Sequence, residues 1–129
     1  MPDSPANRHR QAAPLTRLAI FISVLGSLGL LVPLSENPEW QPLLNFLHIP
    51  LFCLVAWTWT ATLRATGRSR LFSVAMVFAI GIAVAVVSEL IQIWVPGRYA
   101  DYDDLARDAV GLLLGVMAGA LWPRLSNAA

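Results

Sequence analysis

Four long apolar stretches, separated by short polar breaks, divide this chain. Each approaches the roughly 20 residues that a helix needs to cross the hydrocarbon core of a bilayer. Lipid offers no hydrogen bonds to an open backbone, so each stretch is predicted to be helical; barrel strands would instead show alternating segments of about ten residues. The pattern predicts an all-α, polytopic membrane bundle of four transmembrane helices at about residues 18–34, 43–63, 71–95 and 105–122.

The composition supports this interpretation. Hydrophobic residues make up 57% of the 129 residues and charged residues only 13%. A soluble domain of this size has too little interior to bury so many apolar side chains. We therefore expect the protein to lie in the lipid bilayer and to bind no nucleic acid. The chain is predicted to contain one membrane domain over residues 17–125, a flexible cytoplasmic tail over residues 1–16 and a short C-terminal tail over residues 126–129.

The basic residues are all arginines, and their distribution predicts an orientation. Seven of the nine lie at the termini or between the second and third stretches, whereas the other two loops carry two. The positive-inside rule then places both termini in the cytoplasm of a bacterial inner membrane and the acidic loops outside. The seven arginines are Arg8, Arg10, Arg17, Arg64, Arg68, Arg70 and Arg124; the other two are Arg98 and Arg107.

The N-terminus also has the basic lead and apolar run of a signal peptide. The run is long, and residues 31–35 offer no small-x-small cleavage site, so we interpret the first helix as an uncleaved anchor. The residues before Arg17 are rich in proline and polar types, which is typical of a disordered tail.

Common soluble-enzyme chemistries have no support in the sequence. Cys53 is the single cysteine and has no sequence neighbour that would activate it, so we interpret it as a small buried hydrophobe. Two histidines, one of them in the tail, give no zinc-ligand spacing, and no phosphate loop, nucleophile elbow or dinucleotide fingerprint is present. We expect no metal and no cofactor.

The candidate site is a polar group of residues placed where the membrane tolerates few. A charged residue at mid-bilayer costs roughly 2.5–3.5 kcal/mol on insertion scales, so such residues usually have partners and a task. At 1.5 Å rise per residue, these positions fall within roughly 10 Å of the outer surface on three helices. The expected ligand-binding residues are His48, Glu89, Gln92, Arg98, Asp101, Asp104, Arg107 and Asp108, and the catalytic candidates among them are Glu89, His48 and Asp108.

Glu89 has two interpretations. It forms a structural ion pair with Arg98 or Arg107, or it is a carboxylate that faces a small water-filled cavity and exchanges a proton or holds a ligand. His48 is likewise either a proton partner of that carboxylate or is bonded to a backbone carbonyl just before Pro50.

The start of the fourth helix carries two further expectations. Either one of Asp103 and Asp104 is a plain helix cap, because free amides and the helix dipole favour negative charge there, or these acids belong to the functional site. Small residues recur along the same helix at Gly111, Gly115 and Gly119, and let another helix approach closely.

These residues resemble the VanZ-like membrane proteins, a family named for a teicoplanin-resistance protein. The similarity covers roughly residues 40–120 and includes a second-helix histidine, His48. It also includes a Glu-x-x-Gln helix end, a Pro-x-Arg loop, an Asp-x-x-Asp-Leu segment and a small-residue helix. In this chain these are Glu89 to Gln92, Pro96-Gly97-Arg98, Asp101 to Leu105, and Gly111 with Gly115.

The chain departs from the family pattern in three places. Leu44-Asn45 stands where the family commonly has Asp-Lys, and Phe52 stands in place of tyrosine. Asp108 stands in place of asparagine, so either it is protonated or Arg107 or Arg98 compensates its charge.

The resemblance implies a cell-envelope protein linked, through the namesake, to glycopeptide resistance. Three functions remain open. In the first, the polar residues bind or process an envelope or lipid-linked molecule, such as an anionic headgroup. In the second, they form a structural clasp that only holds the helices together, and the protein associates with membrane partners through Gly111, Gly115 and Gly119; in the third, the protein is a proton-coupled transporter that acts as a homo-oligomer.

Overall fold

The computed structural model describes residues 4–31, 41–96 and 100–122 of the chain. Within these residues it contains four helices and no strand. The all-α prediction is therefore confirmed. The helices are α1 (Pro5–Leu31), α2 (Gln41–Ala65), α3 (Arg70–Gln92) and α4 (Tyr102–Ala120).

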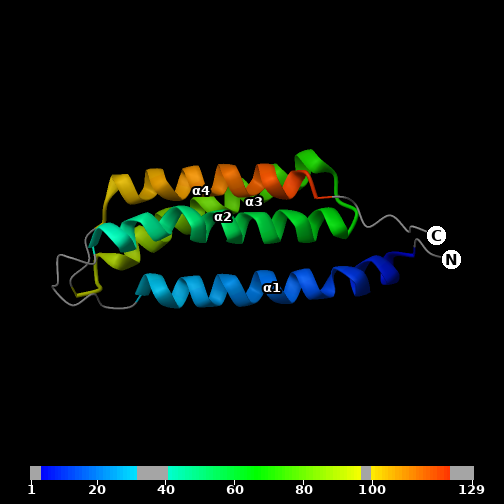
Figure 1. The fold of residues 1–129 in the computed structure, drawn as a ribbon, viewed down its shortest axis with the longest axis horizontal. Coiled ribbons are helices and arrows are strands. Elements are labelled where there is room, and N and C mark those ends of the chain that lie inside the picture. Colours follow the sequence, from blue (N-terminus) through cyan, green and yellow to red (C-terminus); the bar gives the residue numbers. More distant parts are fainter. Residues whose placement is uncertain (1–3, 32–40, 97–99, 123–129) are drawn as a thin grey trace.

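The helices run up and down in an antiparallel bundle (Figure 1). α2 packs against each of the other three helices, most extensively against α4, whereas α1 and α3 barely touch each other. The start of α1 and the end of α4 lie at one end of the bundle. At the opposite end α1 and α3 finish and α2 and α4 begin. This end holds His48, Glu89, Gln92, Asp101, Asp104, Arg107 and Asp108.

Three of the four helices are long and apolar enough to cross a membrane. The spans are Pro5–Gly29, Asn45–Ala65 and Arg70–Gln92. α4 is less apolar, because its first two turns carry four charged side chains. Large apolar side chains cover the outside of the bundle, as expected for contact with lipid; Phe21, Phe46 and Leu71, for example, are 64%, 64% and 80% exposed.

The N-terminal helix is longer than the hydropathy pattern predicts. The sequence indicates a flexible tail before Arg17, but the structure is helical from Pro5. Proline suits the first helical position, where its missing N–H is not needed. The tail prediction is wrong over these residues because hydropathy marks the part of a helix that lies in lipid and not the whole helix.

The other helix boundaries lie within a few residues of the predictions. α3 ends at Gln92 and not at residue 95, and α2 and α4 each begin before the predicted position. A short turn joins α2 to α3. There Gly67 adopts a positive φ of 90°, and its N–H and that of Arg68 bond back to the carbonyls of Arg64 and Leu63. This is a Schellman ending, which favours glycine at this position.

The glycines of α4 face α2. A Cβ atom added at Gly111 would lie 2.5 Å from the backbone oxygen of Ile49, and one at Gly119 would lie 2.6 Å from the Thr60 side chain. A Cβ atom at Gly115 would collide with the backbone oxygen of Cys53. Because α2 of the same chain covers this face, the idea that it joins another membrane protein does not fit the structure.

Candidate functional site

Five of the predicted polar side chains are buried at the same end of the bundle, where α3 ends and α2 and α4 begin. All are less than a tenth exposed, even though four of the five are ionisable. Such side chains are almost never buried singly in lipid, and they need partners within the protein. The buried polar cluster consists of His48 on α2, Glu89 and Gln92 on α3, and Asp104 and Asp108 on α4.

His48 and Asp108 form the closest contact between helices in the cluster. Nδ1 of the imidazole lies 2.8 Å from Oδ1 of the carboxylate, and both side chains are almost fully buried. The expected bond from His48 to a backbone carbonyl is therefore not the one observed. Asp108 is paired with this histidine and not with Arg107, which was one of the alternatives that the sequence left open. Arg98, the other arginine considered, lies outside the described residues.

Among the residues that the structure describes, Glu89 makes one side-chain hydrogen bond through one carboxylate oxygen and none through the other. Its Oε2 accepts a bond of 3.0 Å from the backbone N–H of Asp101. Its Oε1 is buried and has no hydrogen-bond partner among the described residues. The predicted ion pair with Arg107 is not formed, and Arg98 lies outside the described residues.

The start of α4 is arranged differently from the prediction. The helix cap is Asp101, whose side chain accepts a 2.9 Å bond from the N–H of Asp103. Asp104 points inward and forms an ion pair with Arg107 three residues further along the helix. Asp103 is exposed and lies outside the buried polar cluster.

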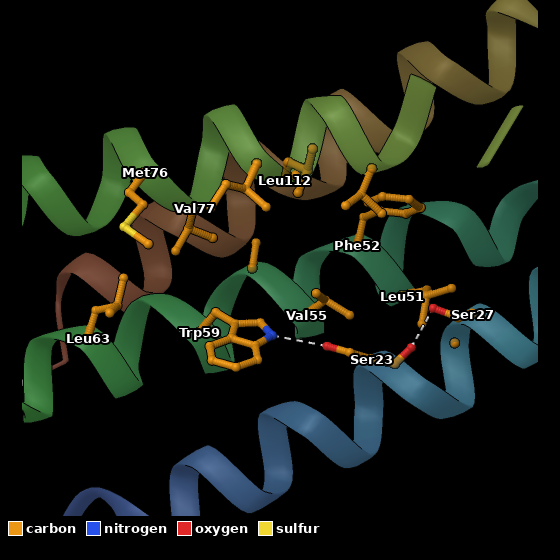
Figure 2. A pocket seen from close by; sticks show the side chains of 15 residues that line it. Ser23, Ser27, Leu51, Phe52, Val55, Trp59, Leu63, Met76, Val77 and Leu112 are labelled. Atoms are coloured by element: carbon orange, nitrogen blue, oxygen red, sulfur yellow. Dashed lines mark hydrogen bonds between the residues drawn. The ribbon is translucent and has the colours of Figure 1, made fainter. Parts of the chain in front are cut away.

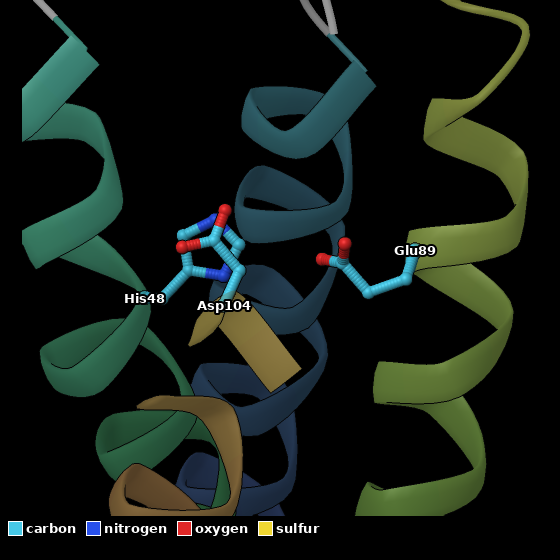
Figure 3. Close-up of side chains that lie close together, drawn as sticks. All are labelled: His48, Glu89 and Asp104. Carbon is cyan, nitrogen blue, oxygen red and sulfur yellow. The ribbon is translucent and has the colours of Figure 1, made fainter. Parts of the chain in front are cut away.

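Three helices bring together a potential set of metal ligands. One ligand atom each of His48, Glu89 and Asp104 lies within 4.8 Å of the others, and all three residues are buried. Figure 3 shows the carboxylate of Glu89 pointing from α3 toward the side chains of the other two. No metal-ligand spacing was recognisable in the sequence, because these ligands are far apart along the chain and come together only in the fold.

Sequence reasoning also missed the role of one aromatic residue. The ring of Phe52 stacks on that of His48, with centroids 6.4 Å apart and planes inclined by 14°. The two residues are four positions apart on α2, so they share a helical face, which is the signal that could have linked them.

An apolar groove lies beside the buried polar cluster. Its volume is about 450 Å³, within the range of ligand pockets, and its lining comes from all four helices. Figure 2 shows Leu51, Val55 and Trp59 of α2 facing this space. Phe52 lines the groove while it stacks on His48, so the groove adjoins the cluster.

The fold and the site define a class: a small helical membrane protein with a buried polar cluster at one end of its bundle and an apolar groove beside it. Residues 4–123 match the VanZ/LLP1 family. The chain therefore belongs to this family, which confirms the resemblance seen in the sequence. No curated protein and no solved structure matches the chain.

Proposed function

We propose that this protein binds a lipid-linked molecule of the bacterial cell envelope, with the headgroup at the buried polar cluster and the hydrocarbon chain in the apolar groove. The observation that carries the proposal is the stacking of Phe52 on His48, because it places the apolar groove directly beside the buried polar cluster. A lipid with a polar headgroup has the same two parts in the same order.

The groove suits a hydrocarbon chain. Its lining is apolar except for a few groups, of which Ser23 is bonded at 3.0 Å to the indole N–H of Trp59. The backbones of α1 and α3 stay apart here, while their outward faces carry exposed apolar side chains. The hydrocarbon chain of a lipid can therefore pass from the bilayer into the groove without crossing a polar surface.

The cluster suits a headgroup. An anionic group such as a phosphate is held best by arginine, whose planar guanidinium donates two parallel hydrogen bonds. Arg107 stands at the edge of the cluster with its side chain 32% exposed, and Arg98 lies in the sequence between α3 and Asp101. Glu89, His48 and Asp108 are the candidate acids and bases for any processing of the bound headgroup.

The proposed orientation of the protein in the membrane follows from the distribution of its arginines. The start of α1 and the end of α4 share one end of the bundle, and the arginine-rich segments of the sequence belong to that end. We therefore infer cytoplasmic termini in a bacterial inner membrane and a cluster near its outer face. Resistance to a lipid-tailed glycopeptide is a separate consequence, tested by the teicoplanin susceptibility of cells with and without the protein.

Native mass spectrometry of the full chain in mild detergent tests lipid binding. The probes are a prenyl phosphate and phosphatidylglycerol, which share a phosphate but differ in the chain and the rest of the headgroup. We expect one of them to bind at one molecule per chain. Arg98→Lys is expected to weaken lipid binding, because lysine keeps the positive charge but cannot donate the two parallel hydrogen bonds of a guanidinium group.

A matched pair of variants on α3 tests the groove. Val84 lines it and is half exposed, whereas Val87 is equally exposed but does not line it. Val84→Trp is expected to displace the hydrocarbon chain of the lipid and so to weaken lipid binding, whereas Val87→Trp is expected to leave lipid binding unchanged. Equal binding by both variants, or binding of neither probe to the wild type, would refute the proposal.

A further inference from the structure

We propose that His48, Glu89 and Asp104 form a binding site for one divalent transition-metal ion, with Asp108 as the residue that orients the histidine. The inference goes beyond lipid binding and does not depend on it. It rests on the geometry of the three side chains, on the contact between His48 and Asp108, and on a buried oxygen without a partner.

The geometry brings three ligand atoms near one point. The three atoms lie within 4.8 Å of one another. Zinc bonds to nitrogen and oxygen are about 2.0–2.2 Å long, so the ligand atoms of one tetrahedral ion lie roughly 3.4 Å apart. Rotation of the three side chains toward the ion would have to close the remaining gap on binding. Each ligand comes from a different helix, so an ion would join α2, α3 and α4.

The contact between His48 and Asp108 is the one that metal-binding histidines usually make. Such a histidine donates its second ring N–H to a carboxylate or carbonyl, which fixes the ring and its tautomer. Here Nδ1 is held 2.8 Å from Oδ1 of Asp108, and this leaves Nε2 to coordinate the ion. Asp108 is therefore a positioning residue and not a ligand.

The oxygen of Glu89 supplies an independent observation. Glu89 is 6% exposed, and its Oε1 has no hydrogen-bond partner among the described residues. Figure 3 shows this carboxylate directed at His48 and Asp104. A buried carboxylate oxygen is costly without a partner, and a cation at this point would supply one.

The charges of the cluster agree with a divalent ion. When ionised, Glu89, Asp104 and Asp108 carry three negative charges, and Arg107 beside the cluster supplies one positive charge through its ion pair with Asp104. A divalent ion would balance the remaining two. Imidazole favours zinc and other transition metals, whereas magnesium and calcium prefer ligand sets made of oxygen alone. Three protein ligands would leave a further position open for water or an anion.

Zinc binding to the full chain tests the proposal. The protein is purified in detergent without a histidine tag, stripped with a chelator and titrated with Zn²⁺ in competition with a chelator of known affinity. His9→Gln serves as the background, because this exposed histidine lies at the other end of α1. We expect one ion per chain and a rise in the temperature of unfolding with zinc. Magnesium is expected to bind much more weakly.

Single replacements separate the site from adventitious binding. Asp108→Asn should weaken zinc binding roughly 10–100-fold, and His48→Gln and Glu89→Gln should weaken it further. Asp103→Asn, which changes an exposed acid next to Asp104, should bind as the background does. If a variant fails to fold without metal, Asp104→Asn replaces it in the series. Absence of stoichiometric binding in the background, or the same affinity in the ligand variants, would overturn the site, and neither result bears on the lipid experiment.

Discussion

His48 on α2 and Asp108 on α4 are joined across the bundle by a contact of 2.8 Å between Nδ1 and Oδ1, at a depth where both side chains are almost fully buried. The contact lies beside Gly111, where the backbones of the two helices approach closely. Close backbone packing and a buried polar contact thus occur at the same level of the bundle. They explain why α4, although it is not among the three helices apolar enough to cross a membrane, packs most extensively against α2.

The pairing of His48 with Asp108 predicts a coupled loss of stability. Asp108→Asn should lower the free energy of unfolding by about 1–3 kcal/mol, because it leaves a buried polar group poorly satisfied. In a double-mutant cycle with His48→Gln, the coupling energy should be about 0.5–3 kcal/mol. Unfolding in mixed detergent micelles with a chelator present measures the free energies of unfolding and the coupling energy. A coupling energy near zero would show that the contact contributes nothing to the fold.

Glu89→Gln distinguishes a functional carboxylate from a structural clasp. The amide keeps the shape and can still accept the bond from the N–H of Asp101, while it removes a buried charge. We expect unchanged or higher thermal stability in the presence of a chelator, as at sites that trade stability for activity. Glu89→Ala, which removes the acceptor as well, should cost about 1–3 kcal/mol. A clear loss of stability in the glutamine variant would favour the clasp.

Two glycine substitutions should have opposite effects. Gly115→Ala should destabilise the protein by about 1–3 kcal/mol, because the new methyl group would meet the α2 backbone, which cannot move aside as a side chain can. Gly29→Ala in α1 has no atom within 4 Å of the new Cβ and should be neutral or gain up to about 1 kcal/mol from helix propensity. Equal thermal stability of the two variants would contradict the packing of α4 on α2.

The proposed orientation can be tested by cysteine labelling in whole cells. In a Cys53→Ala background, Asp103→Cys should react with a membrane-impermeant maleimide, whereas Arg68→Cys should react only after the cells are opened. Both side chains are exposed, at opposite ends of the bundle. Labelling with the reverse pattern would place the buried polar cluster on the cytoplasmic side.

The sequence alone predicted the helices and all five residues of the buried polar cluster. Apolar runs reveal helices because lipid imposes helical hydrogen bonding on the backbone. Polar residues within those runs stand out for the same reason, so Glu89 and Gln92 on α3 could be singled out without knowledge of the fold. The inward direction of Asp104 and Asp108 followed from their spacing of four along one helix.

The partners within the cluster could not be predicted. His48 and Asp108 are 60 residues apart, and nothing in either segment specifies the other. Their meeting depends on the rotation of α2 against α4, which the close contacts at Gly111 and Gly115 fix. The metal-ligand geometry and the apolar groove likewise depend on the relative placement of whole helices, and the early start of α1 was concealed because its first turns are polar.

Asp101 connects the buried polar cluster to the surface. Its backbone N–H is held by Glu89 of α3, and its side chain caps α4 through Asp103. A ligand that draws the Glu89 carboxylate inward would take the acceptor away from that N–H. Hydrogen exchange at the Asp101 amide would then quicken whenever the cluster is occupied, so an exposed residue at the end of the bundle would report on ligand binding in the buried interior.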